Sequence, residues 1–377
     1  MSVLPLEGIT VVSIEQAVAA PFATRQLAAL GARVIKVERD SGDFARNYDT
    51  TVDGEASYFV WLNRGKESVV LDLKAEADQQ VLRTMLSRAD VFVENLAPGA
   101  VARLGFTAEA LKEINPRLIS VSISGFGEGG PYARKKAYDL IIQCEAGLLS
   151  LTGTEEDPAK VGVSIADIAA GMYAYSGTLA ALLQRARTGE GTHVAVSMLE
   201  ALGEWMQQTY LYAEYSGTAP KRSGAAHASI APYGPFEVSD GVVFLGLQNE
   251  REWALFCDHV LKNPELKGDA LYSTNSLRVA NREQLGALIT AQFQGRTVAE
   301  VQGLLDEVGI ANAQMRTMAE FSAHPQLAAR DRWRTVATPS GTARVALPPV
   351  TLGVEPPMAP VPALGEHTER ILREFAS

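Results

Sequence analysis

The chain has 377 residues, of which 47% are hydrophobic and 21% are charged, as in an ordinary globular protein with enough apolar material for a core. Its formal net charge of −10 argues against a nucleic-acid partner bound through a uniformly basic surface. The N-terminal segment has no basic region, and no uncharged apolar run reaches ~18 residues, so we expect no secretion signal and no membrane partner. The default expectation is a cytoplasmic enzyme or binding protein.

The first 125 residues alternate strand-like and helix-like segments. Apolar runs rich in β-branched residues predict strands at 9–14, 34–38, 68–73, 90–94 and 118–123. Helical patterns lie between them at 17–30, 75–88 and 107–114. Short apolar strands separated by helices indicate a parallel sheet covered on both faces. The predicted fold class is therefore α/β, with an open doubly wound, Rossmann-like large domain.

The remaining chain shows a second, weaker α/β pattern. Helices are predicted at 140–150, 164–187 and 198–215, with a strand at 193–197. Residues 216–235 contain three Gly and three Pro, so we interpret them as a linker or site loop. A strand at 242–247 and helices near 250–262, 283–294 and 297–307 follow. Residues 339–362 hold seven prolines and are expected to run extended, before a terminal helix at 366–375.

The turn after the first strand contains no glycine between Ile14 and Pro21, whereas the dinucleotide fingerprint requires several. NAD binding at this turn is therefore disfavoured. Small side chains at 17–20 still leave room for a ligand at the helix N-terminus, where free N–H groups favour anions. Close packing of alanines against the sheet is the alternative explanation.

Asp167 lies at the start of the predicted 164–187 helix and has two interpretations. Ser164, three residues earlier, makes a capping-box pattern, which would be purely structural. Small and apolar neighbours, with Gly171 one turn later, instead leave room for a bulky ligand. A carboxylate at a helix N-terminus is expected to stay ionised, as a nucleophile requires.

Other catalytic arrangements are poorly supported. No G-x-S-x-G element stands between a strand and a helix, so hydrolysis by a Ser–His pair has no basis. The five histidines and the two cysteines, Cys144 and Cys257, show no metal-ligand spacing, and we expect no metal and no disulfide framework.

Segments spread in order over nearly the whole chain resemble the class III CoA-transferases, the family named for carnitine and bile-acid CoA-transferases. They are 6–9 with 20–21, 30–38, 63–66, 71–74, 93–95, 98–99, 115–119, 124–127 with 130–131, 137–139, 152–153, Asp167 with Gly171, and 196–200. Each segment is weak alone, but their joint order is a strong signal.

The resemblance implies an acyl-CoA substrate, no permanently bound cofactor, and an interlocked homodimer. It implies a large CoA-binding domain from residues 1–220 plus 330–377 and a smaller α/β domain from 221–329. The catalytic aspartate of the family falls on Asp167. Contacts to CoA would fall on Val18, Ala19, Arg39, Leu71, Asp72, Leu73, Lys74, Asn95, Leu96, Ala97, Arg103, Lys136, Ala137, Tyr138 and Asp139.

Chemistry suggests roles within this set. Arg39, Arg103 and Lys136 would bind phosphates, because cationic side chains pair with phosphate oxygens. Leu71 and Leu96 would form apolar walls for adenine or the pantetheine arm.

Related α-methylacyl-CoA racemases share this fold and use a His–Asp pair together with the later aspartate. This chain has Tyr138 before Asp139. A tyrosine with a pKa of ~10 is a poor general base at neutral pH. Racemase chemistry is therefore the alternative enzyme interpretation, and a non-catalytic CoA-binding protein is a third.

For a transferase, Asp167 would attack the donor thioester, form an aspartyl anhydride, and then carry CoA as an aspartyl thioester. Backbone N–H groups at the start of the 164–187 helix or in the 223–229 loop are candidate oxyanion donors. Oxalate and formate members of the family carry a glycine run in the covering loop, and residues 223–229 lack it.

Three runs, 135–143, 164–173 and 247–253, look most like the branch that acts on C4–C5 dicarboxylates. That branch includes succinyl-CoA-dependent transferases for itaconate, citramalate, malate or mesaconate. A distal carboxylate would need a cation or several donors. Arg46, Arg222 and His227 are the candidates, and the alternative for each is an ordinary surface charge.

Overall fold

The computed structural model describes residues 3–375, which pack as two compact units. The first unit comprises 3–148, 161–208 and 327–375, and the second comprises 149–160 and 209–326. The predicted division placed 149–160 and 209–220 in the large domain. Here they belong with the second unit, in which Arg222 donates to the carbonyls of Thr154 and Glu155 at 2.5 and 2.6 Å.

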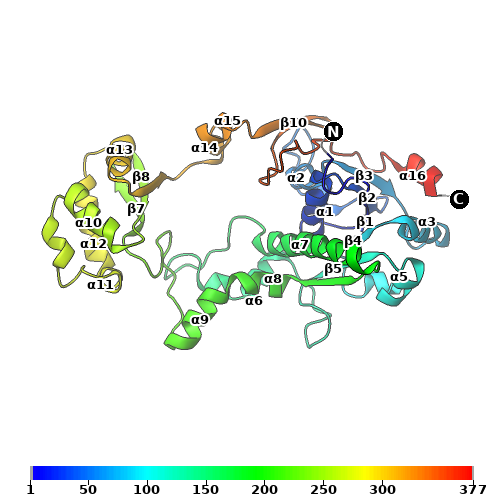
Figure 1. The fold of residues 1–377 in the computed structure, drawn as a ribbon, viewed down its shortest axis with the longest axis horizontal. Coiled ribbons are helices and arrows are strands. Elements are labelled where there is room, and N and C mark those ends of the chain that lie inside the picture. The colour runs from blue at the N-terminus through cyan, green and yellow to red at the C-terminus, as the bar shows by residue number, and fades with distance from the viewer. Residues whose placement is uncertain (1–2, 376–377) are drawn as a thin grey trace. The chain divides into compact units, whose positions relative to one another are not determined.

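A six-stranded parallel sheet forms the centre of the first unit (Figure 1). Its strands are β1 (Thr10–Ile14), β2 (Arg33–Glu38), β3 (Lys66–Val70), β4 (Val91–Glu94), β5 (Ile119–Ser124) and β6 (His193–Ser197). Their order is β3-β2-β1-β4-β5-β6, so the direction of winding reverses between β1 and β4. The predicted α/β class with a parallel sheet is confirmed. A ligand crevice is expected outside the carboxyl ends of these two strands.

Helices cover both faces of this sheet. One core joins the sheet to α1 (Ala19–Ala29), α7 (Ile165–Thr188) and α8 (Met198–Trp205), and the other joins it to α3 (Glu76–Arg88), α5 (Ala108–Ile114) and α16 (Thr368–Phe375). The helix α7 approaches α1 closely, because Gly171 has no side chain. A Cβ there would lie 2.6 Å from the carbonyl oxygen of Ala19.

Smaller elements complete the first unit. They are α2 (Ser57–Asn63), α4 (Ala100–Arg103), α6 (Asp139–Glu145), a 3₁₀ turn at Phe44–Asn47, and the antiparallel pair β10 (Trp333–Thr338) and β11 (Gly341–Ala346). A second 3₁₀ turn, Leu148–Ser150, spans the point in the chain where the first unit gives way to the second. The helix predicted at 198–215 is two helices, since α8 ends before Met206 and α9 (Gln207–Ser216) follows.

The second unit is built on an antiparallel sheet of β7 (Tyr233–Val238), β8 (Gly241–Gly246) and β9 (Ala311–Gln314). Its helices are α10 (Glu250–Leu255) with a π turn at Phe256–Val260, a 3₁₀ turn at Pro264–Gly268, α11 (Asn275–Ala280), α12 (Arg282–Phe293), α13 (Val298–Val308) and α14 (Met318–Ser322), with α15 (Pro325–Ala329) at the boundary. The prediction of a loop through 233–235 was wrong. Pro235 is tolerated there because β7 is an edge strand.

Candidate functional site

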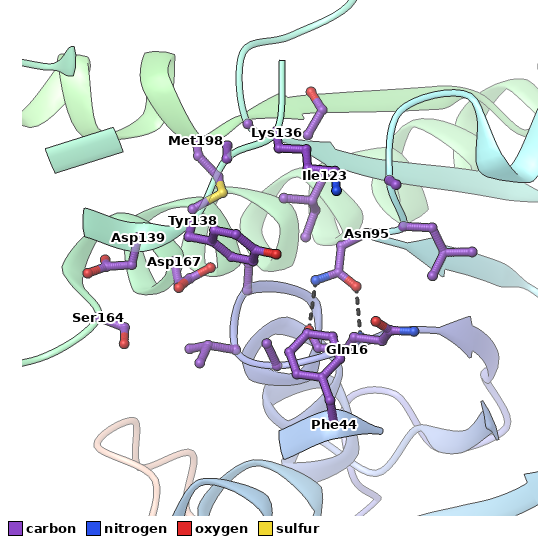
Figure 2. Close-up of a pocket in the computed structure, with 18 of the residues that line it drawn as sticks. Gln16, Phe44, Asn95, Ile123, Lys136, Tyr138, Asp139, Ser164, Asp167 and Met198 are labelled. Carbon is purple, nitrogen blue, oxygen red and sulfur yellow. Dashed lines mark hydrogen bonds between the residues drawn. The ribbon is translucent and has the colours of Figure 1, made fainter. Parts of the chain in front are cut away.

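A cavity of about 590 Å³ opens where the winding of the parallel sheet reverses (Figure 2). Its walls come from the β1–α1 turn, the loop after β4, the end of β5, residues 135–139 and the first turn of α7. Asp167 lies on this wall, half-buried and beside Asp139. The predicted nucleophile therefore stands at the place where open α/β sheets bind ligands.

Two further cavities adjoin this one and share Leu96 with it. One of about 250 Å³ is lined by Arg39 and residues 71–74, and one of about 700 Å³ is lined by Arg103. The central cavity is lined by the other predicted contacts, namely Val18, Ala19, Asn95, Leu96, Ala97, Lys136, Ala137, Tyr138 and Asp139. The structure thus brings the predicted CoA contacts onto one connected set of walls, and their role in binding stays a prediction.

Asn95 follows β4 and forms two hydrogen bonds with Gln16, which follows β1. Its side-chain oxygen accepts the N–H of Gln16 at 2.9 Å, and its amide nitrogen donates to the carbonyl of Gln16 at 2.9 Å (Figure 2). This paired contact fixes the loop after β4 against the β1–α1 turn. The resemblance pointed to Asn95 as a ligand contact, and the geometry gives it a scaffolding role as well.

The β1–α1 turn rests on a buried network of charges. Ala17 adopts φ 60°, unusual for a residue with a side chain, and donates its N–H to the Asp43 carboxylate at 3.1 Å. Asp43 also accepts from Lys36 at 2.6 Å, and Glu15 accepts from Lys66 at 2.6 Å. These fully paired charges hold the turn in place. The N-cap of α1, Val18, makes no side-chain capping bond, and Val18 and Ala19 both line the cavity.

The pKa of Asp167 is raised to about 7, first because its surroundings remove water from the carboxylate and second because of the negative charge of Asp139. The expectation that the helix N-terminus keeps this carboxylate ionised was therefore wrong. Desolvation outweighs the favourable helix dipole at this position.

Asp139, and not Ser164, caps the start of α7. Its carboxylate accepts the N–H of Ala166 at 2.8 Å and a proton from the Gln143 amide at 2.7 Å. The Ser164 side chain makes no capping bond, so the capping-box interpretation of 164–167 was wrong. The cap comes from a residue 28 positions earlier in the chain than Asp167.

The predicted oxyanion donors at the start of α7 are largely occupied. The N–H groups of Ile165, Ala166 and Ile168 donate to the Val163 carbonyl, the Asp139 carboxylate and the Ser164 carbonyl. These three amides are therefore engaged within the chain, and the expectation that they face a reacting group was wrong.

Sequence reasoning missed the aromatic wall of the cavity, formed by Phe44, Tyr48 and Tyr58. The rings of Tyr48 and Tyr58 meet edge to face at 5.6 Å, and the Tyr58 hydroxyl lies 3.4 Å from Ser164 Oγ. Partial burial and the charges of Asp43 and Asp167 raise the pKa of Tyr48 to about 12, so its hydroxyl keeps its proton. The density of aromatic residues between positions 44 and 61 was the available signal.

The three candidates for a distal carboxylate site have other partners. Arg46 pairs with Glu38 at 2.8 Å, lies 3.7 Å from the Phe59 ring centre, and does not line the cavity of Asp167. Arg222 and His227 belong to the second unit. Arg222 binds backbone carbonyls, and the His227 ring stacks on Tyr233 at 5.3 Å.

Two general features bear on the class of protein. Between residues 3 and 375, none of the helices has the length and apolar character needed to cross a bilayer. The same residues contain no group of three or more His, Cys, Asp or Glu side chains placed to hold a metal ion.

Comparison with known proteins supplies the family. The sequence profile of CoA-transferase family III matches residues 6–368. The chain is 34% identical to succinyl-CoA:glutarate CoA-transferase from Mus musculus, over 99% of this chain and 87% of the relative. It is 37% identical to acetyl-CoA:oxalate CoA-transferase from Acetobacter aceti, over 87% of this chain and 85% of the relative.

A solved structure supports the same grouping. The crystal structure of a CaiB/BaiF family protein from Brucella suis matches with a TM-score of 0.87 and 34% identity, covering 99% of this chain and all of that one.

Proposed function

The chain belongs to CoA-transferase family III and is a CoA-transferase, and we propose that it moves CoA from succinyl-CoA to a small dicarboxylate through covalent intermediates on Asp167. The observation that carries this proposal is the position of the Asp167 carboxylate. It lies on the wall of the central cavity, and desolvation and the negative charge of Asp139 raise its pKa to about 7.

Each step exchanges one acyl bond for another. An Asp167 oxygen attacks the thioester carbonyl, the carbon–sulfur bond breaks, and CoA leaves as the thiolate, with a mixed anhydride on the enzyme. The thiolate then attacks the aspartyl carbonyl, which releases the donor acid as its carboxylate and leaves aspartyl-CoA. The acceptor carboxylate reverses these two steps. No net proton transfer is needed, and the covalent route divides one difficult exchange into easier ones.

The oxyanions of these steps need donors, and three of the first amides of α7 are already engaged within the chain. Ala19 at the start of α1, Tyr48 and Tyr58 line the cavity, and the Ala19 N–H and the two hydroxyls are our candidates. The Tyr48 hydroxyl suits the role because its raised pKa keeps it a donor at every pH of interest.

Acyl-CoA enters this scheme as substrate, without a resident cofactor. We place its phosphates toward Arg39, Arg103 and Lys136, since these cations lie on the three connected cavities. The acyl end would then lie between Asp167 and the aromatic wall. We further propose that the protein acts as a homodimer.

We base the proposed acceptor class on the relatives and on the sequence of residues 223–229. One relative acts on glutarate and another on oxalate by their names. Residues 223–229 lack the glycine run of oxalate members, so we propose a C4–C5 dicarboxylate such as glutarate, mesaconate, itaconate, citramalate or malate.

We expect succinyl-CoA and a panel of these acids to yield at least one new acyl-CoA, read by product mass, with oxalate converted at least about tenfold more slowly. Tenfold corresponds to ~1.4 kcal/mol in the transition state, a modest demand on a specificity pocket. Conversion of oxalate alone would reject the dicarboxylate assignment. Exchange of the α-proton with deuterated water, without transfer, would instead establish racemase chemistry.

The transfer rate is expected to rise with pH, with the midpoint of the rise near pH 7, before it levels off. Asp167 attacks only as the carboxylate, and burial with the Asp139 charge raises its pKa to about 7, so the reactive fraction falls below that pH. Asp139→Asn removes the like charge and should move the inflection of kcat/KM to lower pH. A pH profile of both proteins checks this. An unmoved inflection would show that Asp139 does not set this pKa.

A further inference from the structure

Two buried arginines, Arg25 on α1 and Arg64 at the end of α2, have no counter-ion in the described chain. Only 6% of Arg25 and 5% of Arg64 is exposed. The Arg25 side chain makes no hydrogen bond to any residue from 3 to 375, and its Cζ lies 5.2 Å from the centre of the Phe22 ring. Arg64 donates once, to the Trp61 carbonyl at 3.5 Å. Buried nitrogens on both side chains, Nε of Arg25 and Nη2 of Arg64, are left without a partner within residues 3–375.

The other buried cations of the described chain show how unusual this is. Each of them forms an ion pair with a carboxylate: Lys36 with Asp43, Lys66 with Glu15, Arg185 with Asp90, and Arg278 with Glu250, at 2.6 to 2.8 Å. A buried charge is expensive unless it is paired. Among the buried cations of residues 3–375, only Arg25 and Arg64 lack a paired carboxylate.

The two guanidinium groups also repel each other. Burial, and then the charge of Arg64, lower the pKa of Arg25 to about 9, and burial lowers the pKa of Arg64. Arginine keeps its proton at neutral pH, so both side chains remain charged and the free-energy cost of burying them remains. The arrangement is therefore that of a site whose anion comes from outside the described chain.

We propose that Arg25 and Arg64 form a carboxylate-binding site, separate from the cavity of Asp167. Neither arginine lines that cavity. A carboxylate fits because its two oxygens can accept two parallel N–H···O hydrogen bonds from one guanidinium group. A carboxylate is also small and flat enough to reach side chains that are almost fully buried. The aromatic rings of Phe22 and Trp61, 5.7 Å apart, keep the surroundings poor in water. This inference does not depend on the proposed function.

The carboxylate has two possible sources with the same chemistry, a dissolved organic acid and an acidic side chain of a second copy of this chain. The test compares wild type with Arg25→Gln and Arg64→Gln. Arg33→Gln is the matched control, because Arg33 already pairs with Glu67 and Glu374. Sodium acetate serves as the dissolved carboxylate, replacing sodium chloride at constant ionic strength. Unfolding temperature and molar mass by light scattering are the two measurements.

If the source is a dissolved acid, acetate is expected to raise the unfolding temperature of wild type by about 2–4 °C. The rise should persist in Arg33→Gln and disappear in both site variants, which should also match or exceed wild type in chloride because an unpaired charge is gone. Arg25→Lys keeps the charge but loses the fork, so it should retain less than half of the gain.

If the source is a second copy, wild type is expected to be a dimer whose dissociation constant rises at least about tenfold in each site variant and stays unchanged in Arg33→Gln. A wild-type protein with no specific response to acetate, and with an assembly that neither variant alters, would overturn the inference. So would an acetate response that is equal in wild type and both site variants.

Discussion

Asp167→Asn is expected to lose CoA transfer by on the order of 10³-fold or more while keeping its fold. The amide has the shape of the carboxyl group but cannot act as the attacking oxygen anion, so neither the anhydride nor aspartyl-CoA forms. Steady-state transfer from succinyl-CoA measures the loss. Binding of CoA should change little, because the predicted contacts of the CoA chain extend over the neighbouring cavities.

The stability of this variant provides an independent check. The folded protein raises the pKa of Asp167 to about 7 from its usual 3.8, so ionisation of this group costs stability as the pH rises through that interval. Asp167→Asn should therefore unfold at an equal or higher temperature than wild type at pH 8, and the difference should shrink below pH 4. A lower unfolding temperature at pH 8 would show that the carboxylate has a favourable partner.

Chemical trapping separates loss of the nucleophile from loss of binding. Wild type incubated with succinyl-CoA and then with hydroxylamine or borohydride should yield a protein modified at Asp167, visible by intact mass. The variant should yield none. Near wild-type transfer by Asp167→Asn, or trapping at another residue, would end the assignment.

The parallel sheet could be predicted from the sequence because its strands are short runs rich in β-branched residues that alternate with helical patterns. Segments such as 34–38 and 118–123 have this pattern, and the structure places strands within two residues of them. The strand of 233–238 could not be recognised by the same signal. It is an edge strand with one pairing partner and contains Pro235, so its sequence resembles that of a loop.

In the candidate site too, some features could be predicted from local sequence and others depend on residues far apart in the chain. The position of Asp167 at a helix start follows from local sequence, and its resemblance to a known nucleophile follows from the order of motifs. The raised pKa of Asp167 could not be predicted from local sequence, because Asp139 and the residues that exclude water from the carboxylate come from distant parts of the chain. The same is true of Tyr48 and Tyr58, whose place on the cavity wall depends on how residues 44–61 pack against distant parts of the chain.

Gly171→Ala is expected to lower both stability and activity, because it forces apart the two helices that frame the reaction cavity. The new Cβ would lie 2.6 Å from the Ala19 carbonyl oxygen, closer than real Cβ atoms approach any atom, and 3.1 Å from Cδ1 of the Phe22 side chain. Overpacking of this kind costs about 1–3 kcal/mol in the free energy of unfolding. Denaturant unfolding and steady-state kinetics measure the two effects.

The kinetic effect follows from what the two helices carry. Asp167 lies one turn before Gly171 on α7, and Ala19 is both the contact and a wall of the cavity at the start of α1. A displacement of about 1 Å between nucleophile and substrate can reduce kcat/KM by ~10²-fold. The loss should appear mainly in kcat, since the predicted phosphate contacts are elsewhere.

Gly203→Ala provides the matched control. Gly203 is also a glycine within a helix of the same unit, α8, but an added Cβ there meets no atom within 4 Å. Alanine should therefore stabilise the protein by about 0.5–1 kcal/mol and leave transfer unchanged. The opposite signs at two helical glycines would attribute the Gly171 effect to the contact with α1. If Gly171→Ala is also stabilising and fully active, the close approach of α7 to α1 does not position Asp167.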